Sequence, residues 1–366
     1  MASTGAARGV TRRAKASLRV IVVTAVAVLL SLGVARTSAH RAIENAYYDW
    51  WHVLAGVRYT PAHTAVVVID DATFLALKDD PLAFWAPHFA RALEVLTEAG
   101  AKTIGLDVLY QVSAEDWLRK LDLPHSDAAR NYDARLRGAL AKGNVILITH
   151  LVPAQEGAQL LLPPPDQLAM LPRGMHDLGV ANLFPDDDKY VRHFLAAVDP
   201  DARKAGLSFA MQLALRAAGQ DPALDEWEIA GTRLTRESAP LAIGFAGPPG
   251  TIPALSMNAL LKADALRDPA VLALNGRTVI VAVSHAGTAD RHFTPYSRGR
   301  GTELMTGGEI HANVVETILS GRYPRALPAA AEIAYLAVLL MLAVWGFMRL
   351  GAAQGAAVAA GLCAAL

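Results

Sequence analysis

The sequence predicts an α/β domain, with a largely parallel or mixed sheet covered by helices and with transmembrane helices on either side of it. Short β-branched runs alternate with amphipathic stretches through the middle of the chain, which is typical of a sheet packed between helices. Long, nearly uncharged apolar segments lie near both ends of the chain. Hydrophobic residues make up 53% of the 366 residues, and this share exceeds the usual range of soluble proteins.

The first strand and helix are predicted by a change in hydrophobic period. Residues 64–70 (TAVVVID) form a β-branched run, and residues 87–99 place apolar side chains on one helical face. Gly100 ends that helix as a C-terminal cap. Residues 103–109 (TIGLDVL) then predict the second strand.

The same order of elements is repeated once more along the chain. Residues 127–141 predict a helix and residues 144–149 (NVILIT) a third strand. Two consecutive βαβ units predict parallel pairing with right-handed crossovers. Residues 277–283 (RTVIVAV) are a further buried strand after an Asn-Gly turn. No boundary is indicated inside residues 36–328, which we therefore treat as one domain.

The N-terminus predicts a membrane anchor. Residues 20–35 carry no charge, and residues 1–19 contain only basic charged side chains, namely Arg8, Arg12, Arg13, Lys15 and Arg19. This pattern predicts a transmembrane helix with a cytoplasmic N-terminus. A cleaved signal peptide is the alternative, with small residues at 37–39, but the apolar run is slightly long for a signal core.

Two further apolar segments lie at the C-terminus. Residues 329–348 carry only Glu332 and are long enough to cross a bilayer. Residues 350–366 predict a third transmembrane helix, in which the chain ends. A buried soluble hairpin is the alternative to these two spans. The single cysteine, Cys363, excludes an internal disulfide, so the middle domain is expected to be stable through its core alone.

Several kinds of function are not favoured by the sequence. The 34 basic and 34 acidic residues give a net charge of zero, so no nucleic-acid partner is expected. No phosphate-binding loop or dinucleotide fingerprint is found, and no cofactor is expected. Ser208 lies in a GLSFA segment that resembles a nucleophile elbow, yet a polar turn replaces the strand that precedes an elbow. Ser208 is better explained as a helix N-cap, and no catalytic residue is predicted.

A metal site is not expected either. Asp290, His292, Glu309 and His311 are ligand-type residues, but they form no H-x₃-H or H-E-x-x-H pair. His311 is interpreted as a structural, hydrogen-bonded histidine. The acidic run at residues 186–188 lacks the remainder of a calcium-binding loop.

Polar side chains at the ends of the predicted strands form the candidate ligand site. Ligands bind outside the carboxyl ends of parallel strands in open α/β sheets, where loops and helix N-termini converge. The alternative is that these side chains cap helices and close loops. The residues predicted to bind a ligand are Asp70, Asp71, Asp107, His150, Ser284 and His285.

A set of motifs between residues 47 and 322 resembles a known family. The most specific are DRHFTP with the following GGEIHANVVETILSG, and the others are DDATF, AGAKTIGLDVLY, DDDKYVRHF, GLSFAMQLA and LNGRTVIVAVS. Together they resemble the CHASE type-2 family, the extracytoplasmic sensory domains of bacterial cyclases and histidine kinases. Lys189 departs from the pattern, because family members often have a glycine there.

The resemblance implies a function in signal transduction. The chain is expected to be the extracytoplasmic input module of a bacterial receptor, multi-pass in the inner membrane, with residues 36–328 outside the cytoplasm. Its expected partners are an unknown small ligand or protein stimulus, the lipid bilayer and a cytoplasmic cyclase or histidine kinase effector. A homodimer is expected because the family signals through paired cytoplasmic domains. The alternatives are a membrane-anchored hydrolase that uses Ser208 or the strand-end acids, and an assembly factor without a ligand.

Overall fold

The structure of the protein is a computed structural model. It describes residues 37–109, 112–121, 127–153, 158–198, 206–285, 290–299, 303–325 and 327–349, together with a few isolated positions. The chain divides into two compact units, of which one comprises Met1–Tyr47 with Arg325–Leu366 and the other comprises Tyr48–Pro324.

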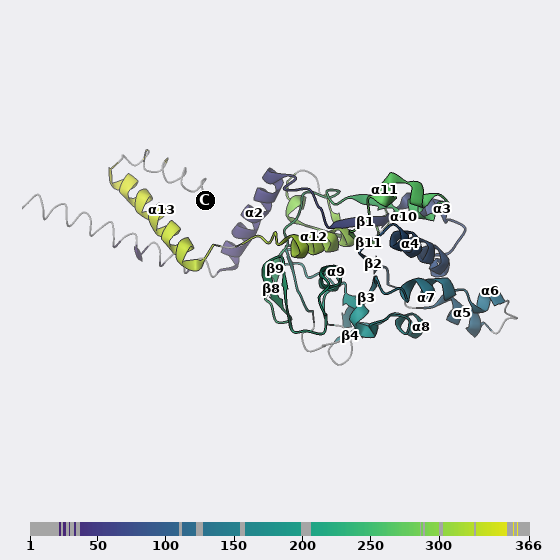
Figure 1. Cartoon of the computed structure of the whole chain (residues 1–366). Coiled ribbons are helices and arrows are strands. Elements are labelled where there is room, and N and C mark those ends of the chain that lie inside the picture. Colours follow the sequence, from purple (N-terminus) through teal and green to yellow (C-terminus); the bar gives the residue numbers. More distant parts are fainter. Residues whose placement is uncertain are drawn as a thin grey trace, which may run out of the picture. The chain divides into compact units, whose positions relative to one another are not determined.

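A mostly parallel sheet organises the second unit (Figure 1). Its strands follow the order β10-β1-β11-β2-β3-β4, and β5 also pairs with β3. All of these pairs are parallel except β3 with β4. The bounds are β1 Thr64–Ile69, β2 Thr103–Asp107, β3 Val145–Pro153, β4 Ala158–Leu161, β5 Leu178–Val180, β10 Ala254–Ser256 and β11 Thr278–Val283.

One detail of the predicted pairing is wrong, because β1 and β2 are not neighbours. β11 lies between them and pairs with both, with Val68, Ala282 and Asp107 side by side in register. The reason is the composition of β11, whose TVIVAV sequence is apolar on both faces and buried over nearly its whole length. Such a strand is most stable in the centre of a sheet that is covered on both sides.

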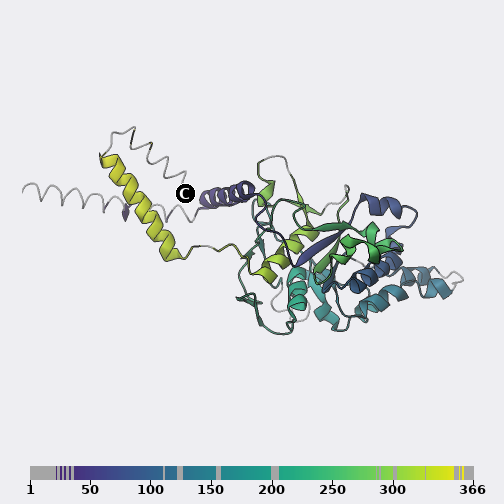
Figure 2. The same cartoon turned by 45° about the horizontal axis from the view of Figure 1, so that its top comes forward.

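Helices cover both faces of the sheet (Figures 1 and 2). On one face, α9 (Phe209–Ala218) and α12 (Gly307–Ser320) pack against alternate strand residues such as Ile280 and Ile146. On the other face, α4 (Ala86–Glu98) and α7 (Ala134–Leu140) pack against the intervening residues, for example Val279. The two-residue period of each strand thus divides the apolar side chains between two cores.

The predicted helix at residues 127–141 is interrupted in the structure. It consists of α6 (Asp127–Arg130) and α7, with a turn between them. Asp133 explains the interruption, because its buried carboxylate accepts hydrogen bonds from the Ser113 hydroxyl and the Glu115 backbone instead of continuing the helix.

The remaining helices and strands are not part of the central sheet. The helices are α2 Ser38–Ala55, α3 Asp71–Ala76, α5 Ala114–Lys120, α8 Pro165–Leu168, α10 Met257–Leu261 and α11 Pro269–Leu272. The 3₁₀ turns are Leu82–Phe84, Gly174–Asp177, Ala265–Arg267 and Pro295–Ser297. Three small antiparallel pairs are formed by β6 His193–Phe194 with β9 Leu241–Ala242, β7 Glu226–Ile229 with β8 Thr232–Thr235, and β12 Arg291–His292 with β13 Met305–Thr306.

The first unit contains α13 (Ala329–Arg349). Its segment Ala329–Gly346 is long and apolar enough to cross a membrane, with a mean hydropathy of 1.9, and it is the one such helix within the described residues. The predicted spans at residues 20–35 and 350–366 lie outside the described residues, apart from isolated positions.

Candidate functional site at the start of helix α12

The N-terminus of α12 lies directly on the carboxyl end of the central strands. Thr306 caps the helix by accepting a hydrogen bond from the Glu309 backbone N–H at 3.4 Å. Gly308 allows the close approach, because a Cβ atom at this position would overlap the Ala282 side chain of β11. The start of α12 therefore reaches the sheet between β11 and β2.

The opposite half of α12 is fixed to the beginning of β1. The buried Glu316 carboxylate accepts hydrogen bonds from the backbone N–H of Ala62 and His63 and from the Thr64 hydroxyl, at 2.9 to 3.0 Å. Charge-assisted bonds of this kind are among the stronger ones in proteins. Helix α12 is thus attached to the sheet along its length, and its N-terminus is held in place.

Two carboxylates meet the first residues of α12. Asp107, the last residue of β2, lies 3.7 Å from the position that a Gly308 Cβ would occupy. Asp290, just before β12, fills the space where a Gly307 Cβ would lie. The two glycines therefore give both carboxylates access to the positive end of the helix dipole, which stabilises negative charge.

These two carboxyl groups have pKa shifts of opposite direction. Burial raises the pKa of Asp107 to about 7, and the nearby Asp290 charge adds to the effect. Burial alone would also raise the pKa of Asp290, but a hydrogen bond with His292, the His292 and His311 rings and the Gly307 backbone outweigh it and lower this pKa. Asp107 has no hydrogen-bond partner within the described residues. The pair therefore combines one stable carboxylate with one that changes charge near neutral pH.

Three histidines surround the two carboxyl groups. His292 lies 2.8 Å from the Asp290 carboxylate, and His150 of β3 and His311 of α12 are both close enough to feel the charge of Asp290. His311 is buried, and its Nε2–H donates to the Ala181 carbonyl at 3.2 Å, as expected for a structural histidine. Burial lowers the pKa of His150 and lowers that of His311 to about 4. Both rings are consequently neutral at physiological pH.

The family described as the CHASE2 domain matches residues 21–348, nearly the whole chain. The chain belongs to the CHASE2 domain family. This confirms the resemblance seen in the sequence motifs. CHASE2 domains are extracytoplasmic sensory domains and not catalytic ones. Comparison with curated proteins and with solved structures finds no match.

The strand-end residues of this CHASE2 domain separate into two groups. Asp107 and His150 share the face of α9 and α12, because they continue the alternation of strand residues such as Gly105 and Ile148 that pack there. His285 lies on the other side, where its ring contacts Phe74 at 4.6 Å between centroids. All of them lie at the carboxyl end of the sheet, but they do not surround one common point.

The remaining members of the predicted site have local roles. Asp70 caps α3 and accepts hydrogen bonds from the Thr73 backbone and hydroxyl and from the Ser256 hydroxyl, at 2.8 to 2.9 Å. These bonds outweigh the effect of burial and lower the pKa of Asp70. Asp71 is exposed in the first turn of α3, and the Ser284 backbone N–H donates to the Ile69 carbonyl. This second group fits the alternative of caps and loop closure.

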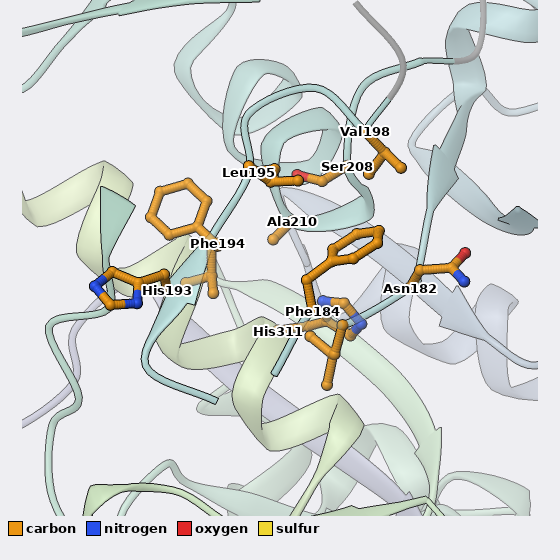
Figure 3. A pocket seen from close by; sticks show the side chains of 11 residues that line it. Asn182, Phe184, His193, Phe194, Leu195, Val198, Ser208, Ala210 and His311 are labelled. Carbon is orange, nitrogen blue, oxygen red and sulfur yellow. The ribbon is translucent and has the colours of Figure 1, made fainter. Parts of the chain in front are cut away.

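A small pocket borders the α12 site near His311 (Figure 3). Figure 3 shows Ser208 and His311 entering it from α9 and α12, with the rings of Phe184 and Phe194 beside them. Its volume of about 20 Å³ is close to the space for one water molecule. The pocket in this state therefore has no room for a metabolite.

Ser208 has the capping role that its sequence predicts. Its hydroxyl accepts a hydrogen bond from the Met211 backbone N–H at 3.3 Å, at the N-terminus of α9. Because the Nε2–H of His311 is directed to the Ala181 carbonyl, no hydrogen bond joins Ser208 and His311 within the described residues. The residues that the structure describes also contain no group of three or more His, Cys, Asp or Glu side chains suited to hold a metal ion.

A buried ion-pair network is the feature that the sequence reasoning missed. Arg192, 1% exposed, pairs with Asp49, Asp186 and Asp188 at 2.7 to 2.8 Å, and Arg298 also bonds to Asp49. Asp49 is fully buried and comes from α2. The acidic run considered for calcium thus neutralises arginine. A sign of this turn in the sequence was Lys189, which stands at a position where family members often have glycine. Its φ of 72° lies in the left-handed region, which glycine adopts most easily.

Proposed function

We propose that this CHASE2 domain is the extracytoplasmic, stimulus-sensing input module of a bacterial transmembrane receptor, and that the start of α12 is the sensing site. The observation that carries the proposal is Asp107, which lies beside Asp290 without a hydrogen-bond partner among the described residues. A partly buried carboxyl group next to a second carboxylate is a group whose protonation or pairing can change. This arrangement favours a cation or a hydrogen-bond donor as the ligand.

The route from the site to the membrane follows the chain itself. Helix α12 ends at Ser320, and only the eight residues 321–328 separate it from the start of α13 at Ala329. A ligand that pairs with Asp107 would relieve the repulsion between the two carboxylates and favour one position of the α12 N-terminus. Such differential stabilisation of two states is what a receptor requires.

Membrane anchoring is the second part of the proposal. We place residues 20–35, 329–348 and 350–366 in the inner membrane, with residues 36–328 outside, and a cyclase or histidine kinase as the cytoplasmic effector. The basic residues before position 20 and the apolar α13 support this topology. Alkaline phosphatase fused after Gly157 should be active, and activity of a cytoplasm-specific reporter at the same site would contradict the topology.

The sensing site can be tested on the purified full chain in detergent. A thermal-shift screen against amines, metal cations and metabolites should identify at least one compound that raises the melting temperature, because a ligand that binds only the folded state stabilises it. The stabilisation should persist in Asp71→Asn, a matched change at an exposed strand-end acid, and disappear in Asp107→Asn. Equal stabilisation of both variants would place the ligand elsewhere.

A membrane-anchored hydrolase is the second candidate function. The observation in its favour is that Ser208 and His311 line the same small pocket. Against it, both side chains are directed to backbone groups, and neither forms the serine–histidine hydrogen bond that activates a nucleophile.

A further inference from the structure

A second, larger pocket lies on the surface next to the segments that lead into α12. It is an open hollow with a volume of about 480 Å³, and Pro249, Arg291, Glu303 and Leu304 line it. We call it the β12 hollow, because Arg291 belongs to β12. Pockets for small molecules typically have volumes of about 300–1,000 Å³. The β12 hollow can therefore admit a metabolite, which the pocket beside His311 cannot.

Hydrogen bonds fix the chain segments that form the β12 hollow. Arg291 pairs in register with Thr306, the N-cap of α12. The Ser297 hydroxyl donates a hydrogen bond to the Glu303 carbonyl at 2.8 Å. The backbone N–H of Gly250 donates at 2.7 Å to a carboxylate in the first turn of α12. A ligand would thus enter a site that is already ordered, and this reduces the entropic cost of binding.

Two opposite charges in the β12 hollow have no partner within the part of the chain that the structure describes. The side chains of Arg291 and Glu303 are exposed, and neither forms a hydrogen bond or an ion pair with another described residue. They do not pair with each other either. The Asp290 carboxylate, which precedes Arg291 in the chain, is bonded to His292 at 2.8 Å. One guanidinium and one carboxylate are therefore both available to a ligand.

The charges select the chemical class of that ligand. A simple anion would be repelled by Glu303 and a simple cation by Arg291, and such repulsion is an effective source of specificity. A zwitterion satisfies both groups. An α-amino acid carries its carboxylate and its ammonium group on the same carbon atom, and a guanidinium binds a carboxylate through two parallel hydrogen bonds. Pro249 and Leu304 supply apolar surface for the side chain of the amino acid.

We propose that the β12 hollow binds a free α-amino acid with an apolar side chain, whose carboxylate pairs with Arg291 and whose ammonium group pairs with Glu303. The lining of the hollow does not include Asp107 or Asp290, so this is a second ligand site. A bound amino acid would connect β12 to the residues just before β13 and stabilise the pairing of Arg291 with Thr306. That this pairing then affects the start of α12 as a sensing site rests on the proposed function, whereas the binding itself does not.

Isothermal titration calorimetry of the purified full chain in detergent tests the ligand class. The common α-amino acids are titrated one at a time, and the tightest binder is then compared with its N-acetyl and its carboxamide derivative. Each derivative lacks one of the two charges, so each should bind about tenfold or more weakly than the free amino acid. Absence of binding by every amino acid, or equal binding of the derivatives, would overturn the proposal.

Variants of the two charged residues test the position of the site. Arg291→Gln and Glu303→Gln should each weaken the binding of the amino acid by about tenfold or more. The matched controls are Arg267→Gln and Glu237→Gln, since both residues are exposed and have no side-chain partner among the described residues. The controls should bind like the wild type, and melting temperatures without ligand confirm that each variant folds. Equal affinities of all four variants would contradict the assignment.

Asp107→Asn separates this inference from the proposed function. This variant should bind the amino acid as the wild type does, because Asp107 does not line the β12 hollow. The expected result therefore stands even if Asp107 proves to be an ordinary structural carboxylate. Loss of amino acid binding in Asp107→Asn, with binding retained in Arg291→Gln, would place the ligand at the start of α12 and overturn the inference.

Discussion

The two charged regions of the domain handle buried charge in opposite ways. Around Arg192, two guanidinium groups face three carboxylates, and the contacts of Arg192 are all at 2.7 to 2.8 Å. At the start of α12, two carboxyl groups lie close enough for one charge to affect the other, and the half-buried His150 and the buried His311 beside them are neutral. In the first region every carboxylate is paired with an arginine, whereas in the second Asp107 has no hydrogen-bond partner among the described residues.

The pKa shifts express the same contrast. Hydrogen bonds from Arg192 outweigh burial and lower the pKa of Asp188, so this group stays ionised. Burial raises the pKa of Asp107 to about 7. A fully paired network fixes geometry, because the loss of either partner leaves an uncompensated charge. An incompletely paired site is suited to respond to a ligand.

The largest effect is expected from Arg192→Ala. It leaves the buried Asp49 without its principal partner, and breaking a buried ion pair in this way costs about 3–5 kcal/mol of unfolding free energy. The matched control is Arg233→Ala, since the Arg233–Glu226 pair is largely exposed and such pairs contribute only about 0–1 kcal/mol. Chemical denaturation of both variants measures the difference. Similar small losses would mean that the Arg192 network does not hold α2 in place.

A smaller effect is expected from Ser208→Ala, and this change also separates the sensor from the hydrolase. Loss of the N-cap of α9 should cost about 1 kcal/mol of unfolding free energy. For a sensor, ligand binding should then be retained. If the wild type hydrolyses an ester substrate and Ser208→Ala abolishes this turnover, Ser208 is a nucleophile and the sensory account is contradicted.

Local sequence patterns predicted most of the fold, and long-range contacts explain what they missed. Strands β1, β2 and β11 and helix α12 follow from hydrophobic period and from glycine at the helix end. The place of β11 between β1 and β2 does not, because it depends on a strand about 170 residues further along the chain than β2. Equally, 143 residues separate Asp49 from Arg192, and no spacing rule connects them.

The candidate site was predictable in its parts but not in its assembly. Asp107 and His150 were found as strand-end residues, and Asp290, His292 and His311 as ligand-type residues of a separate motif. They come together because Gly307 and Gly308 let α12 approach the strand ends. Asp70 and His285 were grouped with Asp107 because all three lie at or just after the end of a strand. Beyond the end of a strand, however, the loop determines on which face of the sheet a side chain lies.

The central claim is that the carboxyl group of Asp107 is poised to change charge at the start of α12. Its pKa in the folded domain is about 7, above the value near 4 in an unfolded chain. Between these two values the folded domain keeps a proton that the unfolded chain has lost. The free energy of unfolding should therefore fall as the pH rises through this window. Above about pH 7 the contribution of Asp107 to the free energy of unfolding should no longer change with pH. Asp290, His150, His292 and His311 are ionisable groups near the same helix end, so the difference in stability between the wild type and a variant is the informative quantity.

The most direct measurement is the melting temperature of the wild type, Asp107→Asn and Asp71→Asn from pH 5 to pH 9. Asparagine resembles the protonated carboxyl group, so the account predicts that Asp107→Asn becomes more stable than the wild type as the pH rises, with the gap largest above pH 7. Asp71→Asn should follow the wild type. A difference between Asp107→Asn and the wild type that stays constant with pH, or a lower melting temperature of Asp107→Asn at every pH, would show that Asp107 is an ordinary structural carboxylate and contradict the proposed site.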